Sequence, residues 1–221
     1  MTLKELLDYS RRQLDDTKSP YLWVKADLVL WLNEAQREAA RRARLLVDSR
    51  TAEICELSVI ANEAYIALDP RILFVRRARL DSQSAPLDKY DVRDLDDCRP
   101  GWEDETGDVW GYVQNEDSRY LRLVGTPTAS DTLKLTVSRL PLEDMTADGD
   151  EPEIAPHYHL NLHHWVLWRA YGVDDADLRD DEKAARNLAL FEAEFGKRGT
   201  AIDEQWTREH HGYSSLEGER L

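Results

Sequence analysis

The chain has 221 residues, of which 29 are lysine or arginine and 44 are aspartate or glutamate, so its net charge is −15. Because 42% of the residues are hydrophobic and seven are tryptophan, the chain has enough apolar surface to fold, which excludes a disordered acidic protein. The negative charge also argues against a general nucleic-acid binder, whose contact surface must be basic.

The sequence shows no signal for export and no membrane anchor. Residues 1–13 carry five charged side chains and no apolar core segment, unlike a signal peptide. The longest stretch without charged residues, 154–168, is too short to cross a membrane. Two cysteines, Cys55 and Cys98, make no disulfide framework. We therefore expect folding in the cytoplasm, with two free thiols.

The N-terminal region is predicted to form two helices. Leucines recur at helical spacing over residues 3–14, and a polar segment at 16–20 ends this pattern. A second amphipathic helix is predicted over about 25–47, with alanines spaced four residues apart on its apolar face. These small side chains would let a neighbouring helix approach closely.

The middle of the chain is predicted to be a small antiparallel β domain. All eight prolines lie between Pro20 and Pro156, so helices are disfavoured there, and the hydrophobic period changes toward two from about Thr51. A short helix is expected near residues 88–97. The predicted strands are residues 51–57, 64–68, 73–80, 109–114, 120–124 and 132–140.

The C-terminal region is predicted to return to helices. Six of the eleven residues 143–153 are acidic, which favours a solvated loop. A third helix is predicted to begin at Pro156 and to end at Gly172, and a long last helix to run from about Ala184 to Trp206.

This order of elements indicates an α+β fold with an inserted domain. We expect residues 1–50 to form one helix pair, residues 51–142 the β domain, and residues 143–221 the second helix pair with a tail. The two helix pairs are expected to pack together as a four-helix bundle.

Four histidines near the third helix are the best metal candidates in the sequence. His159 and His163 are four residues apart, so they share a helix face, as a zinc pair would. His157 and His164 flank them, but no cysteine and no HExxH motif accompanies them. We favour polar histidines at a helix start, and the sequence leaves metal binding by these four open.

The remaining motif tests are negative. The acidic clusters at 94–97 and 103–108 do not have the ligand order of an EF-hand, and no phosphate-binding or nucleophile motif is present. The sequence therefore predicts no enzyme, no catalytic residue, no cofactor and no metal.

Arginines are concentrated at the end of the second helix, among them Arg37, Arg41 and Arg44. Cations at this position complement the helix dipole. They would equally fit an acidic partner surface, such as a neighbouring copy of this chain. The sequence does not separate these two interpretations.

The sequence resembles phage head-to-tail adaptor proteins, the connector or tail tubular protein A-like family of short-tailed phages. The helix residues Asn33-Glu34-Ala35-Gln36 and the Phe191-Glu192-Ala193-Glu194-Phe195-Gly196 motif belong to the similarity. Val24 departs from it, because a serine or aspartate N-cap is expected there. The segments that carry the resemblance are 21–23, 27–28, 32–46, 65–73, 140–141 and 191–196.

The resemblance implies a structural virion protein that is present in the host cytoplasm during assembly. It implies a homo-oligomeric ring of about twelve copies, if the usual portal symmetry applies, that docks on the portal protein and carries the tail nozzle or tube protein. DNA would only pass through the ring. An acidic channel wall, built from segments 88–108 and 143–153, would repel phosphates and let DNA slide.

The last helix and the tail are the expected portal-binding arm. This hypothesis, together with the arginine cluster, gives a predicted partner interface. Its residues are Arg37, Arg41, Arg44, Trp206, Tyr213, Leu216 and Leu221.

Two alternatives remain from other functional classes. A metal-dependent enzyme would use the histidine or acidic clusters, and metal analysis of the purified protein would detect it. A small DNA-end-binding or regulatory protein would use the arginines at 37–50, and its binding would weaken steeply with salt.

Overall fold

The chain folds as two units. The computed structural model describes residues 1–114, 116–117, 119–175 and 178–210, with side chains as far as Trp206. Unit 1 consists of residues 1–46 and 140–198, and unit 2 consists of residues 47–139 together with those from 199 onward. Each unit is described by itself below.

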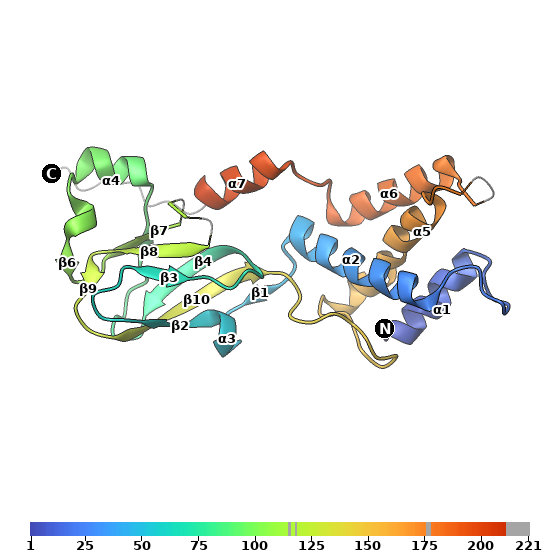
Figure 1. Ribbon diagram of the computed structural model, residues 1–221, viewed down its shortest axis with the longest axis horizontal. Helices are drawn as coiled ribbons and strands as arrows, with labels where there is room; N and C mark the ends of the chain where they lie inside the picture. Colours follow the sequence, from blue (N-terminus) through green and yellow to red (C-terminus); the bar gives the residue numbers. More distant parts are fainter. Residues whose placement is uncertain (115, 118, 176–177, 211–221) are drawn as a thin grey trace. The chain divides into compact units, whose positions relative to one another are not determined.

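Unit 1 is helical and is built around helix α5. Figure 1 shows α5 beside α1, α2 and α6, and it packs against all three of them. Helix α1 begins with a capping box, in which Thr2 and Glu5 each accept a hydrogen bond from the other's backbone N–H. The helices are α1 (Leu3–Gln13), α2 (Lys25–Ala43), the 3-10 helix η2 (Pro156–Leu162), α5 (His163–Tyr171) and α6 (Asp181–Phe195).

The core of unit 1 follows the apolar faces of these helices. Leu28 and Leu32 of α2 are fully buried, and so are Ala35 and Ala39, whose small side chains allow α5 to lie close. Val24 precedes α2 and offers no side-chain cap, as its departure from the expected N-cap residues predicted. Burying one leucine side chain stabilises a fold by about 1.5–3 kcal/mol, so this stripe is a main source of stability.

Unit 2 consists mostly of β-strands, with β10 at the centre of its largest sheet. Strand β10 pairs antiparallel with β1, β2 and β4, and a second sheet has the order β3-β8-β7-β5. The third sheet pairs β6 with β9. The strands are β1 (Val47–Asp48), β2 (Glu56–Val59), β3 (Tyr65–Ala67), β4 (Ile72–Leu80), β5 (Asp88–Lys89), β6 (Thr106–Gly107), β7 (Gly111–Val113), β8 (Tyr120–Val124), β9 (Thr126–Pro127) and β10 (Asp131–Arg139).

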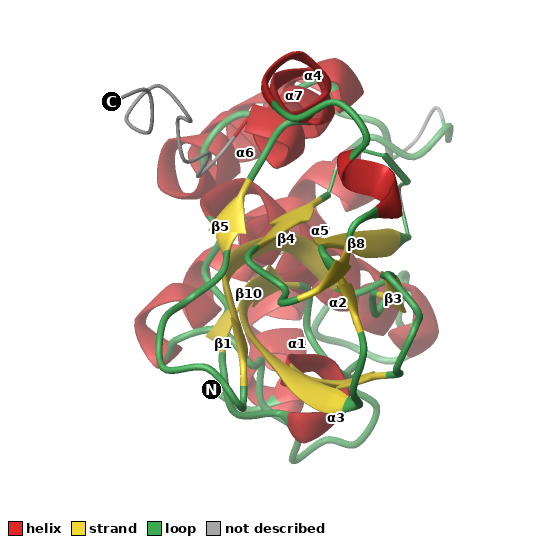
Figure 2. Ribbon diagram, turned by 90° about the vertical axis from the view of Figure 1, so that its left-hand side faces the viewer, coloured by secondary structure: helices red, strands yellow, loops and turns green. Residues whose placement is uncertain are grey.

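Helices flank the sheets at opposite ends of unit 2. Figures 1 and 2 both show α4 (Val92–Cys98) at the top of this unit and α3 (Ala52–Cys55) at its bottom. Leu95 of α4 and Trp102 of the 3-10 helix η1 (Trp102–Asp104) form one buried cluster with Val113 and Val124 of the second sheet. The face of this sheet that carries Val113 and Val124 is therefore covered by α4 and η1.

The predicted four-helix bundle with a small inserted β domain is wrong. Seven α-helices and three sheets occupy the described residues, and the β-strands are a substantial part of the fold rather than a small insertion. The long last helix does not form as one piece. Helix α6 ends before Gly196, whose φ is 86°. A separate helix α7 (Ala201–His210) follows and belongs to unit 2. Only glycine adopts this backbone conformation readily, so the helix stops there.

The β-strands also differ in detail from the prediction. Residues 52–55 form α3 before strand β2 begins, where the sequence pattern predicted a single strand over 51–57. The expected purely antiparallel arrangement is wrong too, because β5 pairs with β7 and β6 with β9 in parallel. These parallel pairs are only two residues long, too short to produce a hydrophobic period.

Candidate partner interface

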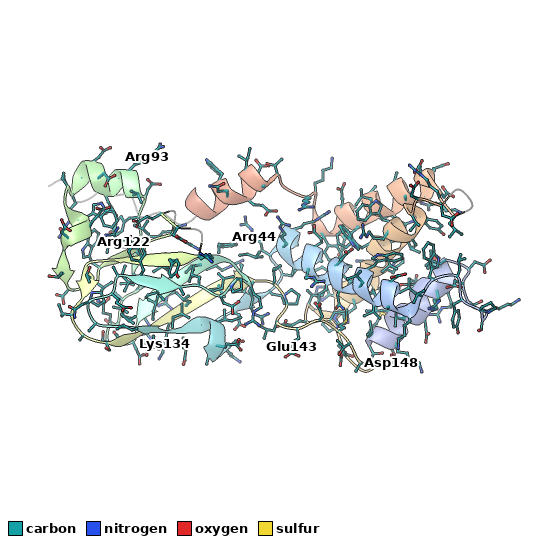
Figure 3. All side chains as sticks on the ribbon, in the orientation of Figure 1. Arg44, Arg93, Arg122, Lys134, Glu143 and Asp148 are labelled. Atoms are coloured by element: carbon teal, nitrogen blue, oxygen red, sulfur yellow. The ribbon has the colours of Figure 1, made fainter. Side chains whose placement is uncertain are left out.

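The arginines predicted to meet a partner lie at the C-terminal half of α2, where they have partners within the chain. Arg37 donates a hydrogen bond to Asp144 over 3.1 Å, and its side chain is 40% exposed. Arg41 lies 3.6 Å from Glu38. Arg44, labelled in Figure 3, follows the end of α2 with a left-handed φ of 52°. Each of the three arginines therefore already has an interaction within the chain.

Arg42, a member of the same arginine cluster that was not assigned to the predicted interface, is the most tightly held of this group. Its Nε donates to Glu38 over 3.0 Å, and its guanidinium lies 5.2 Å from the Trp165 ring and 5.3 Å from the Phe191 ring. The side chain is only 4% exposed. Arg42 therefore joins α2 to α5 and α6 by cation–π contacts rather than serving an external partner.

The acidic segment 143–153 is folded against α2 instead of being a freely solvated loop. The buried Asn33 donates to the Met145 carbonyl over 2.9 Å and accepts from the Met145 N–H over 2.8 Å. Gln36 accepts a hydrogen bond from the backbone of Glu153 over 2.5 Å. Two polar side chains of α2 thus bind the loop backbone, and Figure 3 shows Glu143 and Asp148 on this loop.

Ion pairs neutralise part of this acidic loop. Lys25 of α2 lies 2.5 Å from Asp148, and Arg37 pairs with Asp144. Both pairs are about half exposed and screened by solvent, so neither contributes much to stability. Their main effect is on charge, because they lower the negative potential of the loop surface.

Helix α7 exposes the apolar side chains that the sequence assigned to the portal-binding arm. Trp206 is 62% exposed, and Ile202, four residues earlier on the same helix face, is 78% exposed. A capping box starts the helix, since Thr200 and Asp203 exchange hydrogen bonds of 2.8–3.1 Å. The other predicted arm residues, Tyr213, Leu216 and Leu221, lie outside the described residues.

A second exposed apolar site, missed at the sequence level, lies on the loop between α1 and α2. Tyr21, Leu22 and Val24 are 54%, 56% and 63% exposed. Asp16, which is 6% exposed, fixes this loop by accepting hydrogen bonds from the backbone of Leu22 over 2.7 Å and of Trp23 over 3.2 Å. The sequence feature that could have indicated this site is Tyr21-Leu22-Trp23, in which two exposed apolar residues precede the buried Trp23.

Arg11 holds the same loop from the side of α1. It forms an ion pair with Asp16, donates to the Trp23 carbonyl over 3.0 Å, and stacks 4.1 Å from the Tyr21 ring centre. The loop is therefore preorganised, so a partner that contacts its apolar side chains would lose little conformational entropy of the loop on binding.

The four histidines do not converge on one point. His159 contacts the N-terminal amine and the Ile154 carbonyl, each over 2.8 Å, whereas His164 contacts Asn187 over 3.1 Å. His163 donates to the Leu160 carbonyl over 2.5 Å, and His157 is exposed and stacks on Tyr158. Within the described residues, no group of three His, Cys, Asp or Glu side chains is placed to hold a metal ion.

His163 makes the stability of unit 1 sensitive to pH. Burial lowers the pKa of His163 to about 4 and its neighbour His164 adds to this shift, against the raising effect of the Leu160 hydrogen bond. The unfolded chain binds the proton more readily, so we expect stability to fall by up to about 3 kcal/mol between pH 6.5 and 4. Urea unfolding at a series of pH values measures this loss.

A His163→Phe variant keeps a ring against Tyr9, whose ring centre lies 4.8 Å away, but cannot titrate. We expect it to remove most of the pH dependence between 4 and 6.5, whereas the exposed His157→Gln should keep it. Equal pH profiles for His163→Phe and the wild type would show that another group is responsible.

The two cysteines are free, with Cys55 buried and Cys98 exposed. Burial raises the pKa of Cys55 to about 11, and the nearby Asp48 carboxylate adds to the effect. Cys55 is therefore a protonated, unreactive thiol at neutral pH. Among the described helices, none is long and apolar enough to span a membrane.

Comparison with known families gives one match that covers almost the whole chain. The family model described as SU10 adaptor protein matches residues 1–214. The matched region includes both units. No curated protein matches the chain.

Proposed function

This chain belongs to the SU10 adaptor protein family, and from this premise we propose that it forms a ring that docks on the portal and joins the capsid to the tail. Family membership supports the role of a phage structural adaptor, a component of the virion, and contact with portal and tail components is part of the proposal. The match over residues 1–214 is the observation that carries the proposal. The ring, its docking on the portal and the continuous DNA channel are the proposed parts.

Helix α7 is the proposed portal-binding element. Its exposed Ile202 and Trp206 form an apolar stripe on a ten-residue helix, and a helix this short gains stability when its apolar face is covered. A partner that covers the stripe would therefore stabilise the helix and gain binding energy from the same contact. The residues after 206 would extend this contact.

The proposed DNA channel is lined by acidic side chains. Asp94 and Asp97 of the exposed face of α4 suit this role, because negative charge repels the DNA backbone and prevents sticking. The loop 143–153 contributes less than its composition suggests, because Arg37 and Lys25 pair with two of its carboxylates.

Charge placed on the apolar stripe of α7 tests portal docking. We expect Ile202→Asp to lower the affinity for purified portal about tenfold or more, since it buries a charge in an apolar contact. The matched control is Glu204→Gln, on the same helix but off the stripe. Co-sedimentation with portal measures both variants, and wild-type binding by Ile202→Asp would contradict the docking role of α7.

A further inference from the structure

A hollow on one face of unit 2 combines an aromatic wall with negative charge. It has a volume of about 410 Å³, and its lining includes Glu63, Tyr65, Glu103 and Arg122. Tyr65 of β3 lies opposite Arg122 of β8 in antiparallel register, so their side chains share one face of the sheet. Arg122 also stacks 4.6 Å from the ring of Trp102, which places the hollow on the side covered by η1 and α4.

The charge of Arg122 is already neutralised within the chain. Its guanidinium donates to Glu116 over 2.9 Å and to the Tyr65 hydroxyl over 3.1 Å, and it lies 3.5 Å from the Glu103 carboxylate. The residue is 9% exposed, whereas the Glu103 side chain is 57% exposed and Glu63 is exposed. Two carboxylates thus interact with one guanidinium, and the exposed Glu63 adds a further negative charge to the lining of the hollow. The surplus negative charge suits a lysine or arginine side chain from outside.

The outer face of the largest sheet has the opposite charge. Arg77 and Arg79 of β4 lie opposite Thr136 and Lys134 of β10, so all four side chains share one face. Arg77 is exposed, and in the part of the chain that the structure describes its guanidinium makes no hydrogen bond or ion pair. Arg76 adds a further exposed cation beside it, donating to Ser138 over 2.7 Å.

Among the described residues, the carboxylates that oppose these four cations are Asp81, Glu56 and Asp131, the last through its electrostatic interaction with Arg79. Asp81 pairs with Lys134 over 2.6 Å and lies 3.7 Å from Arg79, and Glu56 lies opposite Lys134 on β2. The face therefore keeps a net positive charge, although the whole chain has a net charge of −15. A positive face on such an acidic protein is a specific match for an acidic partner surface.

The two faces occupy different parts of the surface of unit 2. Figure 3 labels Lys134 of the basic face near the lower edge of this unit and Arg122 of the hollow above it, and the hollow is on the side of its sheet that η1 and α4 cover. One copy can therefore use its basic face and its acidic hollow at the same time, each toward a different neighbour.

We propose that unit 2 makes the contact between neighbouring copies, with the basic face around Arg77 of one copy against the acidic hollow around Glu103 of the next. This inference rests on the proposed ring. A contact between two different faces is heterologous, and heterologous contacts close into rings when the rotation between copies permits. It also lets chains of −15 net charge associate despite their overall repulsion.

Charge reversal on the full chain tests the pairing. Sedimentation velocity at low salt, over a concentration series, measures self-association of the wild type, Arg77→Glu and Glu103→Arg. We expect each variant alone to self-associate about tenfold or more weakly than the wild type. We expect a one-to-one mixture of the two variants to recover assembly. Where the two variants alternate, each contact joins a negative surface to a positive one, because both surfaces of a contact are either reversed or unchanged.

The controls have the same charge changes at exposed positions of α6, Arg186→Glu and Glu182→Arg, and should assemble like the wild type. A wild-type chain that stays monomeric throughout, or a variant mixture no better than its components, overturns the proposal. Portal co-sedimentation is measured on the same samples. Loss of portal binding with assembly of the mixture intact would contradict the proposed function and leave this interface standing.

Discussion

Replacing Asp48 by alanine is expected to destabilise the protein by about 3–5 kcal/mol, because it breaks a buried ion pair in unit 2. The Asp48 carboxylate accepts from Arg139 Nε over 2.7 Å, and both side chains are 8% exposed. It also accepts from the Thr51 hydroxyl over 2.6 Å and from the backbone of Arg50 over 2.8 Å. The alanine variant would leave Arg139 buried without this carboxylate and these donors without an acceptor.

The same contacts predict how the effect depends on pH. Burial alone would raise the pKa of Asp48, but the hydrogen bonds from Thr51, Arg50 and Arg139 outweigh burial and hold the pKa well below its ordinary value. This group therefore contributes stability above about pH 4, and the contribution is lost as the pH falls further. The difference in the free energy of unfolding between the wild type and Asp48→Ala should therefore become smaller as the pH falls below about 4.

Urea unfolding measures both effects. The matched control is Asp81→Ala, which removes a carboxylate that is 52% exposed and pairs with Lys134, and should cost less than about 1 kcal/mol. A loss below about 1 kcal/mol for Asp48→Ala would mean that this ion pair is not a main support of unit 2.

Deleting residues 207–221 is expected to abolish co-sedimentation with the portal, the largest functional effect we predict. The deletion shortens the ten-residue helix α7 by four residues and removes the segment that follows it. A six-residue remnant cannot hold the stripe of Ile202 and Trp206 in helical register. The deletion thus removes the proposed arm and none of the helices of unit 1 or the strands of unit 2.

The control for this deletion removes only residues 217–220, which keeps α7, Leu216 and Leu221. Circular dichroism should show that both truncated chains keep the fold of the rest. Portal binding that survives the removal of residues 207–221 would mean that the chain docks through another surface. The exposed loop at Tyr21, Leu22 and Val24 would then be the first to examine.

Much of the secondary structure could be predicted from the sequence, because it follows from local periodicity. The strict alternation from Leu133 to Leu140 predicted β10, whose odd-numbered residues Leu133, Leu135 and Val137 are buried. The apolar stripe of α2 was equally clear. Both patterns extend over enough residues for the period to be unambiguous.

The break in the last helix was missed because the apolar spacing continues across it. Phe195 and Ile202 lie two helical turns apart, which favours one helix when only the apolar residues are considered. The contrary signals were Gly196 as a helix end and the Thr200–Asp203 pair as a new capping box. Helix-end and helix-start motifs are thus better evidence for where a helix stops than apolar residues that continue at helical spacing.

The partner interface was harder to predict because charge in sequence does not show which charges are already paired. Arg37 looked available from composition alone, yet Asp144 from a loop more than 100 residues later reaches it. The converse holds for Arg77, which lay inside a predicted strand and drew no attention. Only the tertiary fold separates cations that are neutralised within the chain from those that are not.

Sedimentation velocity of the chain with and without purified portal tests the adaptor function most directly. We predict one portal-bound species that carries a whole number of adaptor copies, about twelve, matching the portal symmetry. Independent sedimentation of the two proteins, at adaptor concentrations well above those in an infected cell, would contradict the proposal that this chain docks on the portal.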